Sequence, residues 1–108
     1  MAVRTNLPGV ALLLSLACSG FATPDTYWCR KTANRQCMVS RQQCESRGEC
    51  VMATKAWCFE SGYALGPGSQ MICVAHQHDC ESWRSQRRSD VLSECLQRGP
   101  AEYPSSQR

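Results

Sequence analysis

The sequence predicts a small α+β protein, rich in disulfides and built from two tandem β-β-α-β cysteine repeats. Each copy opens on a Trp-Cys pair, has six residues between its second and third cysteines, and continues from the third cysteine as Cys-Glu-Ser. Agreement in this much detail indicates an internal repeat. The cysteines of the two copies are Cys29, Cys37, Cys44 and Cys50, then Cys58, Cys73, Cys80 and Cys95.

Residues 1–22 have the layout of a secretory signal peptide. Arg4 supplies a positive charge, an apolar run follows at 10–17, and Ala22 ends a small-residue site for cleavage before Thr23. The run is shorter than the roughly 20 apolar residues that span a bilayer. No later segment is more apolar, so we expect no transmembrane segment.

A second processing site competes with this one. Leu16-Ala17-Cys18 resembles the end of a bacterial lipobox, in which Cys18 would become a lipidated N-terminus. Ser15 stands where a lipobox usually has a large aliphatic residue. The sequence therefore leaves two outcomes open: a free secreted chain, or a chain held by a lipid anchor at Cys18.

The cysteine count favours disulfides over a metal. Nine cysteines are present, and without Cys18 eight remain, four in each copy. An even set in a short exported chain is typical of a disulfide framework. Zinc sites usually contain closer cysteine pairs than Cys44 and Cys50, and a Cys-x-x-Cys redox motif is missing. We expect disulfides within each copy, no metal and no cofactor, with the pairing in each set left open.

The first repeat covers residues 23–54. Aromatic and β-branched residues favour its strands, and Asn34 suits a tight turn because Asn tolerates left-handed backbone geometry. Ser40, followed three residues later by Gln43, forms a capping box for a short helix that Gly48 ends. The expected elements are strands at 27–32 and 35–39, a helix to about residue 47, and a strand at 49–52.

The second repeat, residues 55–98, follows the same plan with insertions in the hairpin and at the helix end. Gly and Pro within 61–69 indicate a loop. Cys80, Trp83 and Arg87 share one helix face, so Trp83 would cover a disulfide from Cys80 and stack under Arg87. The expected elements are strands at 56–60 and 71–75, a helix at 77–89 and a strand within 91–97. Residues 99–108 are predicted to be a flexible tail, because Gly99-Pro100 ends the ordered part.

Two groups of residues are candidates for partner contact. Tyr63 and Leu65 lie in the inserted hairpin loop, which the shared frame does not require. Arg84, Arg87 and Arg88 form a basic strip that suits an anionic ligand, although cations are also favoured in the last turn of any helix. We interpret Trp28 and Trp57, which precede the first cysteine of each copy, as packing residues.

Other classes of function find less support. A net charge of +3 is too mild for a nucleic-acid binder. His76, His78 and Asp79 could hold a metal, but they lie outside the shared frame, and Asp79 suits the first turn of a helix. The chain lacks Gly-x-Ser-x-Gly, His-Glu-x-x-His and a Gly-rich phosphate loop, so we expect no enzyme.

The layout resembles small cysteine-rich exported proteins and, in its signal region, bacterial envelope proteins. The resemblance covers only the signal region and the use of cysteine. We expect a disulfide-stapled interaction module, secreted or at the cell envelope, whose partner is a protein or an anionic surface ligand. The alternatives are a secreted antimicrobial or membrane-active effector and an inhibitor of a secreted hydrolase.

Overall fold

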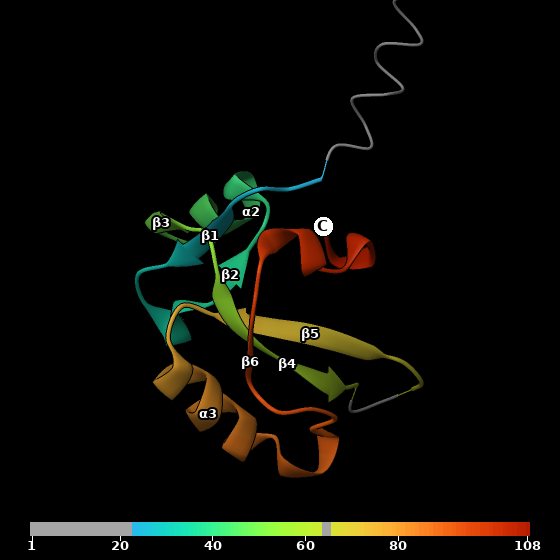
Figure 1. Ribbon diagram of the computed structural model, residues 1–108. Helices are drawn as coiled ribbons and strands as arrows, with labels where there is room; N and C mark the ends of the chain where they lie inside the picture. The colour runs from blue at the N-terminus through green and yellow to red at the C-terminus, as the bar shows by residue number, and fades with distance from the viewer. Residues whose placement is uncertain (1–22, 64–65) are drawn as a thin grey trace, which may run out of the picture.

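Two antiparallel three-stranded sheets and two α-helices form in residues 23–63 and 66–108, which the computed structural model describes, and they confirm the predicted α+β class. The first half contains β1 (Tyr27–Arg30), β2 (Cys37–Met38), α2 (Arg41–Glu45) and β3 (Cys50–Ala53). The second half contains β4 (Ala56–Gly62), β5 (Ser69–Val74), α3 (Gln77–Gln86) and β6 (Leu96–Arg98). In Figure 1 the chain returns after β6 to end beside the first half.

The first strand of each half lies in the middle of its sheet. It pairs antiparallel with its hairpin partner on one side and with the last strand of the half on the other, in the orders β2-β1-β3 and β5-β4-β6. Both halves therefore have the predicted order of strand, strand, helix and strand. The tandem duplication that we infer from the cysteine spacing concerns the origin of the chain and stays a prediction.

Disulfides join the first cysteine of each half to the second, and the third to the fourth. The predicted pairing within each copy is confirmed, and the structure supplies the connectivity that the sequence left open. The bridges are Cys29–Cys37, Cys44–Cys50, Cys58–Cys73 and Cys80–Cys95. The two hairpin bridges join residues directly opposite each other, with Cα atoms 3.9 and 4.1 Å apart. The other two tie each helix to the segment that follows it.

One core cluster joins the two halves. The hairpin disulfides of both sheets contribute to it, and they pack with the buried side chains of Tyr27, Ala56 and Tyr103. Burial alternates along β1, so that Tyr27 and Cys29 face this core while the residues between them are partly exposed. Sulfur thus fills much of the interior that larger aliphatic side chains would occupy in a bigger domain.

A second cluster lies between α3 and the other face of β4 and β5. Phe59, Ile72 and Val74 pack there with the Cys80–Cys95 bridge. Trp83 packs against this cluster from α3, which agrees with the expectation that it covers the bridge from Cys80. Trp57 packs against the same cluster, as the packing interpretation predicts.

The second strand of the first hairpin, β2, is shorter than the predicted strand at 35–39. Residues 33–35 form a 3-10 turn in which φ is positive at all three positions, including the predicted Asn34. Gln36 then pairs with Val74 of β5 in an isolated bridge. The end of the hairpin therefore contacts the second half. Within the first sheet, β2 covers only Cys37–Met38.

Both helices end earlier than predicted. Ser40 caps α2 as expected, since its Oγ accepts a hydrogen bond from Gln43 N at 3.2 Å, but the helix stops at Glu45. α3 stops at Gln86, and a 3-10 turn at Arg88–Asp90 follows. The next segment runs along β4 before β6 begins, because Leu92 N donates to Glu60 O at 2.9 Å.

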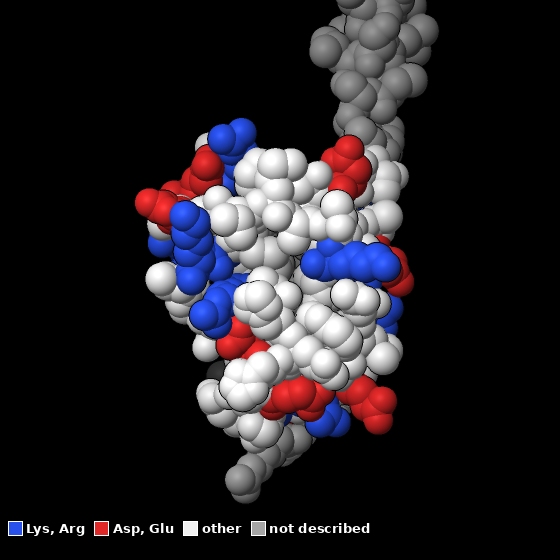
Figure 2. Space-filling view, turned by 60° about the vertical axis from the view of Figure 1, so that its left-hand side comes forward, with Lys and Arg blue, Asp and Glu red and all other residues white. Residues whose placement is uncertain are grey.

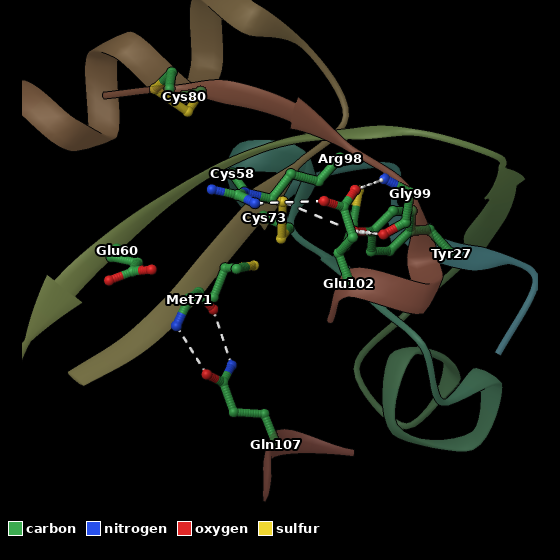
Figure 3. Close-up of a disulfide and its surroundings, with 12 residues drawn as sticks. Tyr27, Cys58, Glu60, Met71, Cys73, Cys80, Arg98, Gly99, Glu102 and Gln107 are labelled. Carbon is green, nitrogen blue, oxygen red and sulfur yellow. Dashed lines mark hydrogen bonds and ion pairs between the residues drawn. A yellow bond between two sulfur atoms is a disulfide. The ribbon is translucent and has the colours of Figure 1, made fainter. Parts of the chain in front are cut away.

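The C-terminal segment differs most from its prediction as a flexible tail. Two 3-10 turns form at Pro100–Glu102 and Ser105–Gln107, and Tyr103 is buried against Tyr27. Figure 3 shows the Gln107 side chain beside Met71 of β5, where its amide accepts from Met71 N at 2.8 Å and donates to Met71 O at 2.9 Å. These tertiary contacts order a segment whose local sequence reads as a loop.

Candidate functional surface

The tip of the β4–β5 hairpin carries the predicted contact residue Tyr63. β4 and β5 extend further than expected, and Gly62 and Ser69 are the last paired residues before the tip. The Tyr63 side chain is 46% exposed. Its ring lies over Gly68, where any added Cβ would stand 3.5 Å from the ring, and the φ of Gly68 is +100°. Gly68 therefore suits the positive φ of this turn, whereas a Cβ there would meet the ring only at an ordinary van der Waals distance. Leu65 lies outside the described residues.

The predicted basic strip is not one free surface. Arg84 Nε donates to Ser93 O at 2.9 Å, and Arg87 Nε donates to Ser61 Oγ at 2.8 Å. Both guanidinium groups are partly buried and hold α3 to neighbouring segments. The side chain of Arg88 lies outside the described part of the chain. Arg87 was also expected to stack on Trp83, whereas in the structure its guanidinium group bonds the hydroxyl of Ser61.

Ser61 is a buried polar residue that the sequence analysis missed. It is fully buried in β4, accepts from Arg87 and donates to Gly62 O at 3.3 Å. A buried hydroxyl is costly without partners, so the contact explains why Arg87 points inward. The alternation of β4 could have placed Ser61 on the α3 face. The contact ties the C-terminal end of α3 to β4 just before the hairpin tip that carries Tyr63.

The His-Asp cluster does not assemble into a metal site. Asp79 pairs with Arg35 of the first half, with Arg35 Nη1 at 3.0 Å from Asp79 Oδ2, while His76 and His78 are exposed. Within residues 23–63 and 66–108, no group of three His, Cys, Asp or Glu side chains is placed to hold a metal ion. Asp79 thus joins the two halves and lies in the first turn of α3, as expected.

Exposed apolar side chains also occur outside the predicted sites. Val51 and Met52 are exposed on β3, Leu96 on β6, and Leu92 on the segment before it. A hollow of about 530 Å³ lies where β3 turns into β4. It is lined by Thr26, Met52, Ala53, Thr54, Lys55 and Gln97. Apolar residues in a predicted strand normally indicate burial. The residue types of β3 therefore did not indicate that Val51 and Met52 are exposed.

Charge is mixed on the face of the molecule that Figure 2 draws. Figure 2 shows acidic and basic side chains interspersed around a continuous uncharged area on one face. This face offers no broad surface of a single sign for a polyanion. Among the described residues, no helix has the length and apolar content needed to cross a bilayer. Cys18 and the predicted signal region lie outside the described residues.

The fold and the surface together define a small disulfide-rich α+β protein. Four disulfides indicate an oxidising, extracytoplasmic environment. No family model, curated protein or solved structure matches this chain.

Proposed function

We propose that this protein is a secreted or envelope-associated binding module without catalytic activity, and that the β4–β5 hairpin tip contacts a protein partner. The observation that carries the proposal is the half-exposed Tyr63 ring on a hairpin that is fixed at several points. Tyrosine is enriched at the energetic centres of interfaces, because it contributes a large rigid surface and a polar hydroxyl.

The frame below the tip supports this function. The Cys58–Cys73 bridge crosses the hairpin, and the Ser61–Arg87 contact holds its β4 strand to α3. Covalent and buried contacts reduce the conformational freedom that binding would otherwise remove, so a rigid hairpin binds with a smaller entropic cost than a flexible one.

A protein partner has more support than an anionic ligand. Two of the three arginines in the predicted strip use their Nε groups inside the fold. An inhibitor of a secreted hydrolase is a special case of the same proposal, because a rigid hairpin tip can enter an active-site cleft. The lack of nucleophile and metal-protease motifs supports a role without catalysis.

Site-specific crosslinking tests the proposal. A photo-crosslinking amino acid at position 63 of the exported chain should give a discrete adduct with another extracytoplasmic protein. The same group at position 96 is the control, because Leu96 is 47% exposed and Tyr63 is 46% exposed. Unlabelled wild-type chain should compete for the adduct, and the Tyr63→Ser chain should compete at least about tenfold more weakly, as expected for loss of an aromatic anchor.

Two results would contradict the proposal. One is equal labelling from positions 63 and 96, which would mean that the tip has no preferred partner. The other is full competition by Tyr63→Ser. Purified secreted hydrolases mixed with the wild-type chain separate the inhibitor case, since only an inhibitor lowers their rates.

A further inference from the structure

We propose that the outer edge of β3 docks a second copy of this chain by antiparallel pairing of the two β3 strands. β3 lies at the end of its sheet with β1 as its neighbour, and Figure 1 shows it at the outer side of the first half. Val51 is 44% exposed and Met52 is 65% exposed. An open edge with apolar side chains is a template for another strand, and three features of this edge select a second copy.

The first feature is the direction of the backbone groups. Lys31 N donates to Glu49 O at 3.1 Å, so the main-chain groups of Glu49 face β1. Main-chain groups alternate in direction along a strand, and therefore those of Cys50 and Met52 face outward. Within the part of the chain that the structure describes, these outward groups have no main-chain partner.

The second feature is the register that these groups allow. In an antiparallel pair with a two-fold axis, Met52 would stand opposite Met52 of the second copy, and Cys50 opposite Thr54. About six hydrogen bonds could then form, because all the groups that face outward meet each other. Centring the pair on Val51 would also match the outward groups of Cys50 with those of Met52, but it would bring Lys55 opposite Arg47 of the second copy. The charges at the ends of the strand therefore favour the register centred on Met52.

The third feature is the charge at the ends of the strand. The same register places Glu49 opposite Lys55 of the second copy, twice by symmetry. The Glu49 carboxylate is 79% exposed, and Lys55 is exposed. Glu49 also bonds Lys31 at 2.9 Å in its own chain, which holds the pKa of its carboxyl below the ordinary value and keeps it charged. Opposite charges directly across two strands favour pairing.

An apolar row would continue across the new junction. Trp28 stands opposite both Met38 and Met52, so the three side chains share one face of the sheet. Arg41 lies over the Trp28 ring, 4.8 Å from its centre. Pairing would place the two Met52 side chains together and extend the row into the second copy. Because one short strand buries little area, we expect a dimer in rapid exchange whose population depends on concentration.

Sedimentation equilibrium of the exported chain and two charge variants tests the pairing. The wild-type chain should show a mass that rises toward that of a dimer with concentration. Glu49→Lys and Lys55→Glu should each associate at least about tenfold more weakly, because each places like charges opposite one another. An equimolar mixture of the two variants should regain association, since both charge contacts are complementary in the mixed pair.

The mixture makes the test independent of folding defects, because a misfolded variant would not be rescued by the other. Leu96→Lys on the edge of β6 is the matched control and should associate like the wild type. A wild-type chain that stays monomeric up to about 1 mM, a concentration at which even weak pairing is visible, would overturn the proposal. A mixture that associates no better than the separate variants would overturn it as well.

Discussion

Tyr27 shows how a single residue ties distant parts of this chain together. Its hydroxyl donates to Gly99 O at 2.9 Å, and its ring packs edge-on against Tyr103 with centroids 6.3 Å apart. The residue is fully buried beside the Cys58–Cys73 bridge (Figure 3). The pKa of the Tyr27 hydroxyl is raised from 10.0 to about 12. Burial is the largest cause, and the nearby Glu102 carboxylate is the second. The folded state therefore favours the protonated, neutral form of Tyr27.

This shift predicts a loss of stability at alkaline pH. The folded-state pKa lies above the unfolded value, so the contribution is complete below pH 10 and is lost as the pH rises from about 10 to about 12. The free energy of unfolding should fall by about 1 kcal/mol between pH 9 and 11. Urea unfolding at the two pH values measures it.

Matched variants separate Tyr27 from other alkaline effects. Tyr27→Phe removes the ionisable hydroxyl, so it should be less stable at pH 9 by about 1 kcal/mol for the lost hydrogen bond and should show a flatter pH dependence. Tyr63→Phe changes an exposed phenol and should keep the wild-type dependence. An unchanged slope in Tyr27→Phe would show that Tyr27 is not the group responsible.

The turn at residues 33–35 links the first half to the second. Ala33, Asn34 and Arg35 have φ values of 55°, 67° and 53°, a region in which side chains other than those of Gly and Asn are disfavoured. The Arg35 carbonyl accepts from Ala75 N at 3.0 Å, and the Arg35 side chain pairs with Asp79. These contacts with the second half support the strained geometry.

Replacing Ala by Gly usually lowers the stability of a folded protein, but at position 33 we expect it to raise stability. Ala33→Gly should raise the free energy of unfolding by about 0.5–1 kcal/mol, because Gly adopts positive φ without steric cost. Ala33→Val should lower it by at least as much. Ala101→Gly, at an exposed position in the 3-10 turn Pro100–Glu102, is the control and should be neutral or destabilising. Thermal unfolding under oxidising conditions gives the values, and destabilisation by Ala33→Gly would contradict the interpretation.

The elements that sequence predicted well are those set by local chemistry. Ser40 caps α2, Asn34 adopts left-handed geometry, and the cysteines pair within each copy. The boundaries that differ were set by distant contacts, such as the pairing of Gln36 with Val74. Tyr103 is the clearest case, because its Pro- and Ser-containing surroundings are typical of a loop, and its burial comes from tertiary packing in the core cluster that includes Tyr27.

The candidate surfaces were predictable to a smaller extent. Tyr63 could be selected because its loop is an insertion in the second copy that the first copy lacks. The contact of Arg87 could not be predicted from the sequence. Helix spacing places Arg87 near Trp83, but it does not indicate that the buried hydroxyl of Ser61 lies within reach. The outer edge of β3 depends on which strand ends the sheet, and residue types alone do not carry that information.

At the scale of the whole molecule, the disulfides replace a large apolar interior. They close loops with sequence separations of 8, 6, 15 and 15 residues. Each bridge contributes about 2–4 kcal/mol, chiefly by restricting the unfolded chain. Together they are comparable with the whole net stability of a small domain, about 5–15 kcal/mol. Because the hairpin bridges also form the core between the halves, reduction should unfold both halves.

Peptide mapping by mass spectrometry, on chain recovered from its natural compartment without reduction, tests this account most directly. We expect the four linked pairs Cys29–Cys37, Cys44–Cys50, Cys58–Cys73 and Cys80–Cys95. Free thiols at these positions, or a bridge that joins a cysteine before residue 54 to one after it, would contradict the account.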